Sequence, residues 1–125
     1  ASQRKESIAV LGDLSFLHDI TGLIHDEKIN LKIFVINNNG GGIFSTLGHR
    51  GVDGFEAIFG TPHNLDLAKI GAAFGLATSE VKNQSELRTE IAKPVVGISL
   101  VVVSAPDRES NADHLQEIYA SVNSI

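Results

Sequence analysis

The chain has 125 residues, enough for one domain with a substantial buried core. Its 10 basic and 15 acidic residues give a formal net charge of −5, which excludes the basic surface that nucleic-acid binding requires. We therefore expect a single domain over residues 1–125 that does not bind nucleic acid.

The chain contains no cysteine, so it has neither a disulfide framework nor a thiolate metal site, as is typical of proteins of the reducing cytosol. No stretch approaches the roughly 20 apolar residues that a membrane span needs. The first residues, ASQRKE, also lack the apolar region of a signal peptide. The sequence therefore predicts a cytoplasmic protein without a membrane span.

The first elements in chain order are predicted to be a strand, a helix and a second strand. Residues 7–11 form a short apolar run that ends at Gly12-Asp13, which predicts a buried strand with an acid at its carboxyl end. Apolar residues recur at helical spacing over residues 14–24, and residues 31–36 predict the second strand. Two parallel strands joined by a helix form a right-handed βαβ unit.

The second half of the chain is predicted to continue this alternation after a long loop. Residues 45–62 are irregular and rich in glycine, with one short helical turn around residues 55–59. A loop of this length in a compact domain is commonly functional. The later elements are a helix over 64–74 capped by Asn64, a strand over 76–81, a helix over 85–91, a strand over 95–103 and a helix over 113–122.

Alternation of strands and helices predicts an α/β fold, with a doubly wound, mostly parallel sheet and helices on both faces. Four strands make a small sheet of this kind. We therefore expect the chain to be a fragment of a larger subunit, truncated at its N-terminal side.

The most informative stretch runs from Asn37 to Phe44, where a buried strand breaks into three asparagines and three glycines. An isolated run of this kind forms a flexible polar turn, but at the carboxyl end of a parallel strand it is typical of a phosphate or cofactor site. Ile43 and Phe44, directly after the glycines, are typical of a pocket wall.

Asp13 and Asn38 would emerge at the same edge of the sheet if the first two strands are neighbours. A carboxylate, an amide oxygen and a backbone carbonyl are hard oxygen ligands that suit Mg²⁺, which completes its coordination with phosphate oxygens and water. The helix after Asp13 would offer N–H groups to the same phosphates.

Other site chemistries find no support in the sequence. The glycine run matches neither GxGxxG nor a P-loop, and no serine lies in a GxSxG elbow. The histidines share no zinc-ligand spacing. They are His18, His25, His49, His63 and His114.

The two anchors together, Gly12-Asp13 and Asn37-Asn38, resemble the cofactor signature of thiamine-diphosphate-dependent enzymes. Four segments, which are spread over nearly the whole chain, are more narrowly similar to the C-terminal, diphosphate-binding domain of the SEPHCHC synthase family (2-succinyl-5-enolpyruvyl-6-hydroxy-3-cyclohexene-1-carboxylate synthases) of menaquinone biosynthesis. These segments are residues 12–19, 37–44, 59–63 and 107–111.

The resemblance implies a role for each matching residue. The side chains of Asp13 and Asn38 and the carbonyl of Gly40 would bind Mg²⁺ or Mn²⁺, while Ile43 and Phe44 would line the substrate side of the cofactor. The residues of this chain that would bind the cofactor, directly or through the ion, are Gly12, Asp13, Leu14, Ser15, Asn38 and Gly40. No catalytic residue is expected within this chain.

The resemblance also implies an activity and partners. Members of this family are transferases that act as carboligases: 2-oxoglutarate loses carbon dioxide and the remaining unit is joined to isochorismate. The pyrimidine half of the cofactor is bound by a different domain of a partner subunit, in a homodimer or homotetramer. A glycine-rich strand and helix that normally open the domain are missing before Ser7, so we expect the chain to be inactive alone.

Two alternatives remain at this point. One is another thiamine-diphosphate-dependent 2-oxo-acid decarboxylase or synthase. The other is a non-catalytic doubly wound binding or regulatory module, in which Asp13 accepts a phosphoryl group or binds a metal. That module would carry a lysine at a late strand end, but the strand ending at Val103 is followed by Ser-Ala-Pro.

Overall fold

The computed structural model describes residues 6–24, 28–46 and 50–123. The chain divides into two compact units, which are described separately below. The first comprises Ala1–Asn37 and Asp66–Ala105, and the second comprises Asn38–Leu65 and Pro106–Ile125. The expectation of a single domain stays a prediction.

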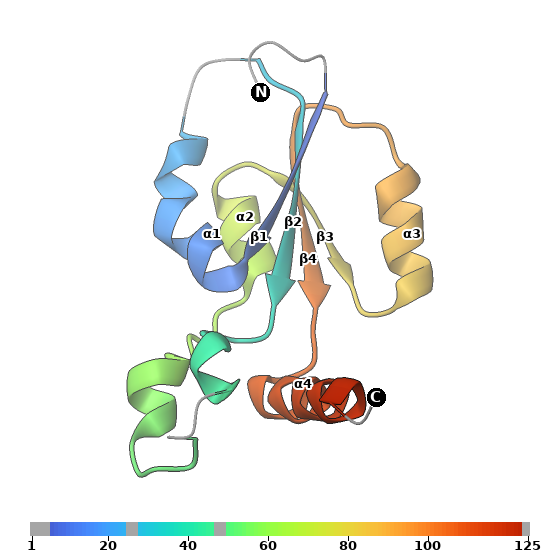
Figure 1. The fold of residues 1–125 in the computed structure, drawn as a ribbon. Helices are drawn as coiled ribbons and strands as arrows, with labels where there is room; N and C mark the ends of the chain where they lie inside the picture. Colours follow the sequence, from blue (N-terminus) through green and yellow to red (C-terminus); the bar gives the residue numbers. More distant parts are fainter. Residues whose placement is uncertain (1–5, 25–27, 47–49, 124–125) are drawn as a thin grey trace. The chain divides into compact units, whose positions relative to one another are not determined.

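The first unit is built on a parallel sheet of four strands in the order β1-β2-β4-β3 (Figure 1). The strands are β1 (Ser7–Gly12), β2 (Leu31–Asn37), β3 (Ala77–Val81) and β4 (Ile98–Ser104). The two central strands, β2 and β4, are mostly apolar, as expected of strands with helices packed on both faces. The predicted parallel α/β sheet is confirmed.

Helices of the first unit cover both faces of this sheet (Figure 1). They are α1 (Asp13–Asp19), which continues as the 3₁₀ turn η1 (Ile20–Leu23), α2 (Leu67–Ala73) and α3 (Gln84–Ala92). Phe16 of α1 and Leu67 of α2 pack in one core cluster with Val35 and Leu100. Leu87 of α3 packs in a second cluster on the opposite face of the sheet. The doubly wound arrangement is therefore confirmed.

Strand β1 is less buried than predicted. Ile8 and Val10 are 57% and 65% exposed, although their run was expected to form a buried strand. The reason is the position of β1 at one edge of the sheet. Helix α3, which covers the face to which Ile8 and Val10 point, packs near β3 and β4 toward the opposite edge and leaves β1 uncovered.

Several element boundaries also differ from the sequence pattern. Asn64 was expected to cap α2, but its φ of +51° lies in the left-handed region, and Asp66 caps the helix instead by accepting a hydrogen bond from Lys69 N. The last strand begins at Ile98 rather than residue 95, because Gly97 at φ +62° turns the chain immediately before it.

The second unit contains the 3₁₀ turn η2 (Ile43–Thr46), the π-helical turn η3 (Glu56–Gly60) and helix α4 (Arg108–Asn123). The short helical turn predicted around residues 55–59 is confirmed. Helix α4 begins five residues before the predicted residue 113, since the carboxylate of Asp107 accepts a hydrogen bond from Ser110 N and caps an earlier start. None of the helices in the described part of the chain is long and apolar enough to cross a membrane.

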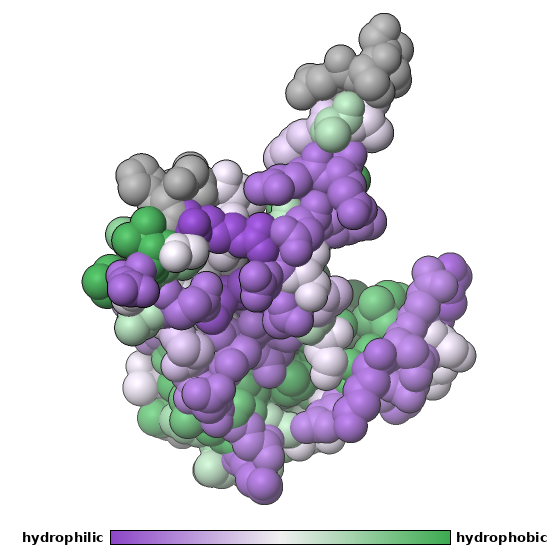
Figure 2. Space-filling model, turned by 90° about the horizontal axis from the view of Figure 1, so that it is seen from below, coloured by the Kyte–Doolittle hydropathy of each residue, from purple (hydrophilic) through white to green (hydrophobic). Residues whose placement is uncertain are grey.

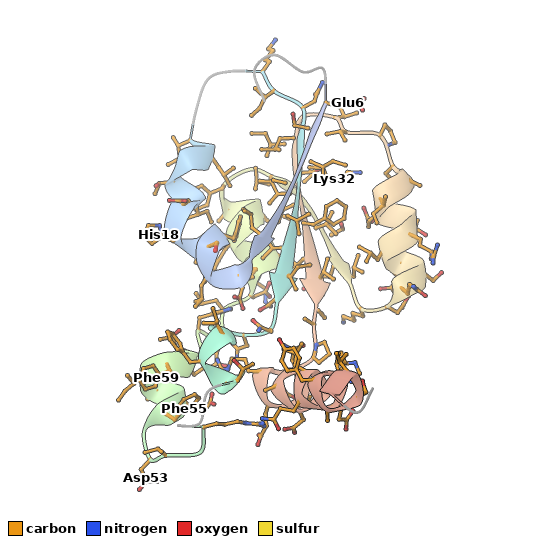
Figure 3. The ribbon with its side chains drawn as sticks, viewed as in Figure 1. Glu6, His18, Lys32, Asp53, Phe55 and Phe59 are labelled. Carbon is orange, nitrogen blue, oxygen red and sulfur yellow. The ribbon has the colours of Figure 1, made fainter. Side chains whose placement is uncertain are left out.

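One charged residue is buried in the first unit for a structural reason. Lys32 of β2 is 3% exposed and points toward α3 (Figure 3), where its Nζ donates to the carbonyls of Glu90 at 2.9 Å and Lys93 at 2.7 Å. The last carbonyls of a helix have no partners within the helix, and a cation is favoured there. Lys32 therefore ties the end of α3 to the sheet.

Replacing Lys32 with methionine should lower the free energy of unfolding by about 2 kcal/mol, because both carbonyls lose a charged donor. Urea unfolding measures the change in the free energy of unfolding. Amide hydrogen exchange in α3 is measured alongside it. Lys82→Met is the control, since its side chain is 71% exposed. Equal unfolding midpoints for the two variants would contradict the role of Lys32.

Candidate functional site

In the first unit, the candidate residues lie where β1 passes into α1. Asp13 is the first residue of α1 and only 2% exposed, and its Oδ1 accepts a hydrogen bond from Leu14 N at 2.7 Å. Gly12 and Ser15 on either side are exposed. A Cβ added to Gly12 would meet no atom within 4 Å, so its backbone is open to a ligand.

The carboxyl ends of three strands meet at this edge. Gly12 at the end of β1 lies opposite Ile36 of β2, so the first two strands are neighbours as predicted. Asn37 ends β2 and pairs with Ser104 of β4, and its carbonyl accepts a hydrogen bond from Ala105 N at 2.9 Å. In parallel α/β sheets, ligands bind at the carboxyl ends of strands.

In the second unit, the backbone that follows Asn38 has an unusual and well-fixed conformation. Asn39 has φ +61° and Gly40 has φ +128°. The amides of Asn39 and Asn64 are paired: Asn39 Nδ2 donates to Asn64 Oδ1, and Asn64 N donates to Asn39 Oδ1, both at 2.8 Å. Gly41 N donates to Gly60 O at 2.8 Å. We call residues 38–42 the amide-glycine loop.

Arg108, the first residue of α4, contacts this loop within the same unit. Its Nη1 donates to the carbonyls of Asn39 at 2.7 Å and Gly60 at 2.6 Å, and its Nη2 pairs with the carboxylate of Glu56. Sequence reasoning placed Arg108 in a matching segment but gave it no role. These contacts join residues 48 to 69 positions apart, and no local pattern indicates them.

The apolar pair Ile43-Phe44 follows the loop in η2 and is exposed. The ring of Phe44 lies against that of Phe59, with centroids 5.3 Å apart, and Phe59 lies equally close to Phe55. Phe55 and Phe59 are labelled in Figure 3. Figure 2 shows hydrophobic residues exposed among predominantly hydrophilic ones on one face of the molecule. The aromatic contacts hold Phe44 in place at an exposed position, as a pocket wall requires.

The second unit also has a pocket of about 940 Å³. Asn38 and Asn39 of the amide-glycine loop line it, together with Arg50 and with Asp107 and Arg108 at the start of α4. The loop therefore borders open space that a ligand can enter.

Two charged groups that line this pocket are stabilised by their neighbours. A hydrogen bond to Asp113 raises the pKa of Arg50, with further contributions from the charges of Asp113 and Glu109. The pKa of Asp107 is lowered, because the backbone N–H and then the hydroxyl of Ser110 donate to its carboxylate. Both groups keep their usual charges at neutral pH.

The donor set expected for the ion is consistent with Mg²⁺. In the described part of the chain, no three His, Asp or Glu side chains lie together as metal ligands. The expected set instead combines one carboxylate, one amide and one main-chain carbonyl, all hard oxygen donors of the kind that Mg²⁺ takes. His25 and His49 lie outside the described residues.

The predicted site residues fall into two groups. Gly12, Asp13, Leu14 and Ser15 lie together at the start of α1 in the first unit. Asn38, Gly40, Ile43 and Phe44 lie on one segment of the second unit. Joint binding of one ion by the two groups stays a prediction.

Comparison with known proteins places residues 1–104 in the family described as "Thiamine pyrophosphate enzyme, C-terminal TPP binding domain". Over 111 residues the chain is 40% identical to the 2-succinyl-5-enolpyruvyl-6-hydroxy-3-cyclohexene-1-carboxylate synthase of Thermobifida fusca (strain YX), covering 86% of this chain and 19% of that protein. The synthase of the same name from Rhodococcus erythropolis (strain PR4 / NBRC 100887) is 40% identical over 125 residues, covering 93% of this chain and 22% of that protein. The chain thus spans about a fifth of the length of these relatives.

Proposed function

Since this chain belongs to the thiamine pyrophosphate enzyme family, as its C-terminal cofactor-binding domain, we propose that it is part of a carboligase joining decarboxylated 2-oxoglutarate to isochorismate in menaquinone biosynthesis. The proposal rests on the similarity of this chain to the two 2-succinyl-5-enolpyruvyl-6-hydroxy-3-cyclohexene-1-carboxylate synthases described above. The chain is 40% identical to each of them over most of its length. The family match also counts against the alternative of a phosphoryl-accepting regulatory module.

Within this function, the first unit would bind the diphosphate end of the cofactor. Gly12, Leu14 and Ser15 would contact the diphosphate, a role supported by the open space beside Gly12 at the start of α1. Asp13 would bind Mg²⁺ or Mn²⁺, and its position beside the strand ends supports this role. When bound, thiamine diphosphate supplies an electron sink for the reacting carbon.

The second unit would complete the ion's protein ligands and form the substrate wall. Asn38 would bind the ion through its amide oxygen and Gly40 through its carbonyl. Ile43 and Phe44 would face the substrate side of the cofactor and exclude water from it, which their exposure and the contact of Phe44 with Phe59 support.

The remaining parts of the enzyme would come from elsewhere. We propose that the pyrimidine half of the cofactor is held by a domain of a partner subunit in a homodimer or homotetramer, and that this chain alone is inactive. The short span relative to the curated relatives supports this view. The cysteine-free composition supports a place in the cytoplasm.

The function is tested in the full-length protein with thiamine diphosphate and Mg²⁺. We expect 2-oxoglutarate to release carbon dioxide in step with the loss of isochorismate, one molecule for one, and to release little without isochorismate. Other 2-oxo acids serve as competing donors. If one of them reacts faster, or if isochorismate is not consumed, the protein is a different thiamine-diphosphate enzyme of the same class.

A further inference from the structure

We propose that Arg108 is a positioning residue that fixes the amide-glycine loop, residues 38–42, in the conformation from which Asn38 and Gly40 bind the metal ion. This inference rests on the proposed function for the identity of the ion, but the contacts that carry it lie entirely within the second unit.

The guanidinium group of Arg108 bridges two segments that are distant in sequence. Its Nη1 donates both to the carbonyl of Asn39, which immediately precedes Gly40, and to the carbonyl of Gly60 at the end of η3. Gly60 O in turn accepts a hydrogen bond from Gly41 N. The peptide groups on both sides of Gly40 are thus joined to the same small network, which restricts the direction of the Gly40 carbonyl.

The packing around this network leaves no room for side chains at Gly40 and Gly60. A Cβ on Gly60 would lie 2.6 Å from Glu56 Oε2 and 2.9 Å from Arg108 Cζ. A Cβ on Gly40 would collide with Gly60 O and with Arg108 Nη1. The glycines allow the guanidinium to approach the backbone directly, and this close approach is what lets one side chain hold both segments.

The contacts of Arg108 have an energetically unfavourable feature that a purely stabilising role does not explain. The side chain of Arg108 is only 12% exposed, and its Nε is buried with no hydrogen-bond partner among the described residues. A buried donor without a partner is unfavourable and calls for an explanation, such as a functional constraint. A fixed loop that presents ligands to an ion is such a constraint, because preorganised ligands bind more tightly.

A lysine cannot replace this arginine. Its single ammonium group keeps the charge but lacks the planar fork that reaches Asn39 O, Gly60 O and Glu56 together. The substitution Arg108→Lys therefore removes the geometry and keeps the charge. Arg88→Lys is the matched control, since it makes the same exchange at an exposed position on α3 of the first unit and Arg88 is not among the residues that line the pocket.

The experiment compares Arg108→Lys, Arg88→Lys and wild type in the full-length protein. Calorimetry measures the Mg²⁺ concentration that gives half-maximal binding of thiamine diphosphate, and mass spectrometry measures amide exchange in residues 38–42. We expect Arg108→Lys to raise the Mg²⁺ requirement at least about 10-fold, as substitution of residues that support metal ligands does, and to speed exchange in the loop, while Arg88→Lys changes neither.

The outcomes separate this inference from the proposed function. An unchanged Mg²⁺ requirement in Arg108→Lys overturns the positioning role, even if the loop exchanges faster. A Mg²⁺ requirement unchanged by Asp13→Ala overturns the metal assignment instead. Weaker Mg²⁺-dependent binding in both Asp13→Ala and Arg108→Lys, with Arg88→Lys like wild type, supports both.

Discussion

Replacing Asp13 with alanine in the full-length protein is expected to abolish Mg²⁺-dependent binding of thiamine diphosphate. Asp13 is the one carboxylate in the proposed set of protein ligands, and without it only neutral oxygens would face the ion. Mutation of residues that only hydrogen-bond to metal ligands lowers metal affinity about 10–100-fold. Loss of a direct ligand should therefore weaken binding at least about 100-fold. Calorimetric titration of cofactor into the protein, with Mg²⁺ in the buffer and without it, measures the effect.

Two companion variants make the Asp13 result specific. Asp13→Asn keeps the size of the side chain and an oxygen able to accept from Leu14 N, but it removes the negative charge, so we expect an intermediate loss. Asp19→Ala, at the far end of α1 with a side chain 87% exposed, should bind like wild type. Circular dichroism checks that each variant is folded. A folded Asp13→Ala protein with wild-type affinity would rule out this ligand.

The fold was largely predictable because its core strands differ from their surroundings in composition. The central runs around Val35 and Leu100 consist of β-branched and other apolar residues, as buried parallel strands do, and both residues are fully buried. The sequence does not distinguish the edge strand β1 from these central strands, because the run containing Ile8 and Val10 is just as apolar. Burial of a strand depends on its place in the sheet, which local sequence does not reveal.

Helix starts were less predictable than the helices themselves. The apolar periodicity of α4 begins near Leu115, whereas the helix begins at Arg108, because the cap provided by Asp107 precedes the periodic part. Similarly, α3 is capped by Asn83, whose side chain accepts from Glu86 N. Each helix thus begins directly after a polar residue whose side chain accepts a hydrogen bond from the backbone N–H three residues later.

The candidate site was predictable at its strand ends and not in its supporting contacts. Gly12-Asp13 could be recognised because a Gly-Asp pair directly after an apolar run is a local signal. The contacts of Arg108 with Asn39 and Gly60 could not, since they depend on backbone carbonyls that any residue presents. The left-handed conformation of Asn39 is likewise stabilised by Asn64, which lies 25 residues away.

Replacing Gly40 with alanine is the second change for which we expect a large effect. Gly40 has φ +128°, which residues with a side chain rarely adopt, and its added Cβ would collide with Gly60 O and Arg108 Nη1. Backbone strain alone costs about 1–3 kcal/mol. The collision adds to this strain, because the opposing carbonyl belongs to backbone that is itself hydrogen bonded to Gly41 N.

We expect the amide-glycine loop of Gly40→Ala to move, so that binding of Mg²⁺ and cofactor falls at least about 100-fold, as for loss of a direct ligand. Gly51→Ala is the matched control: Gly51 also has positive φ, +87°, but an added Cβ meets no atom within 4 Å. Both variants carry backbone strain and should show lowered urea midpoints. Only Gly40→Ala should show faster amide exchange in residues 38–42 and weaker cofactor binding. If Gly51→Ala weakened binding equally, strain spread through the unit, rather than displacement of the loop, would be the cause.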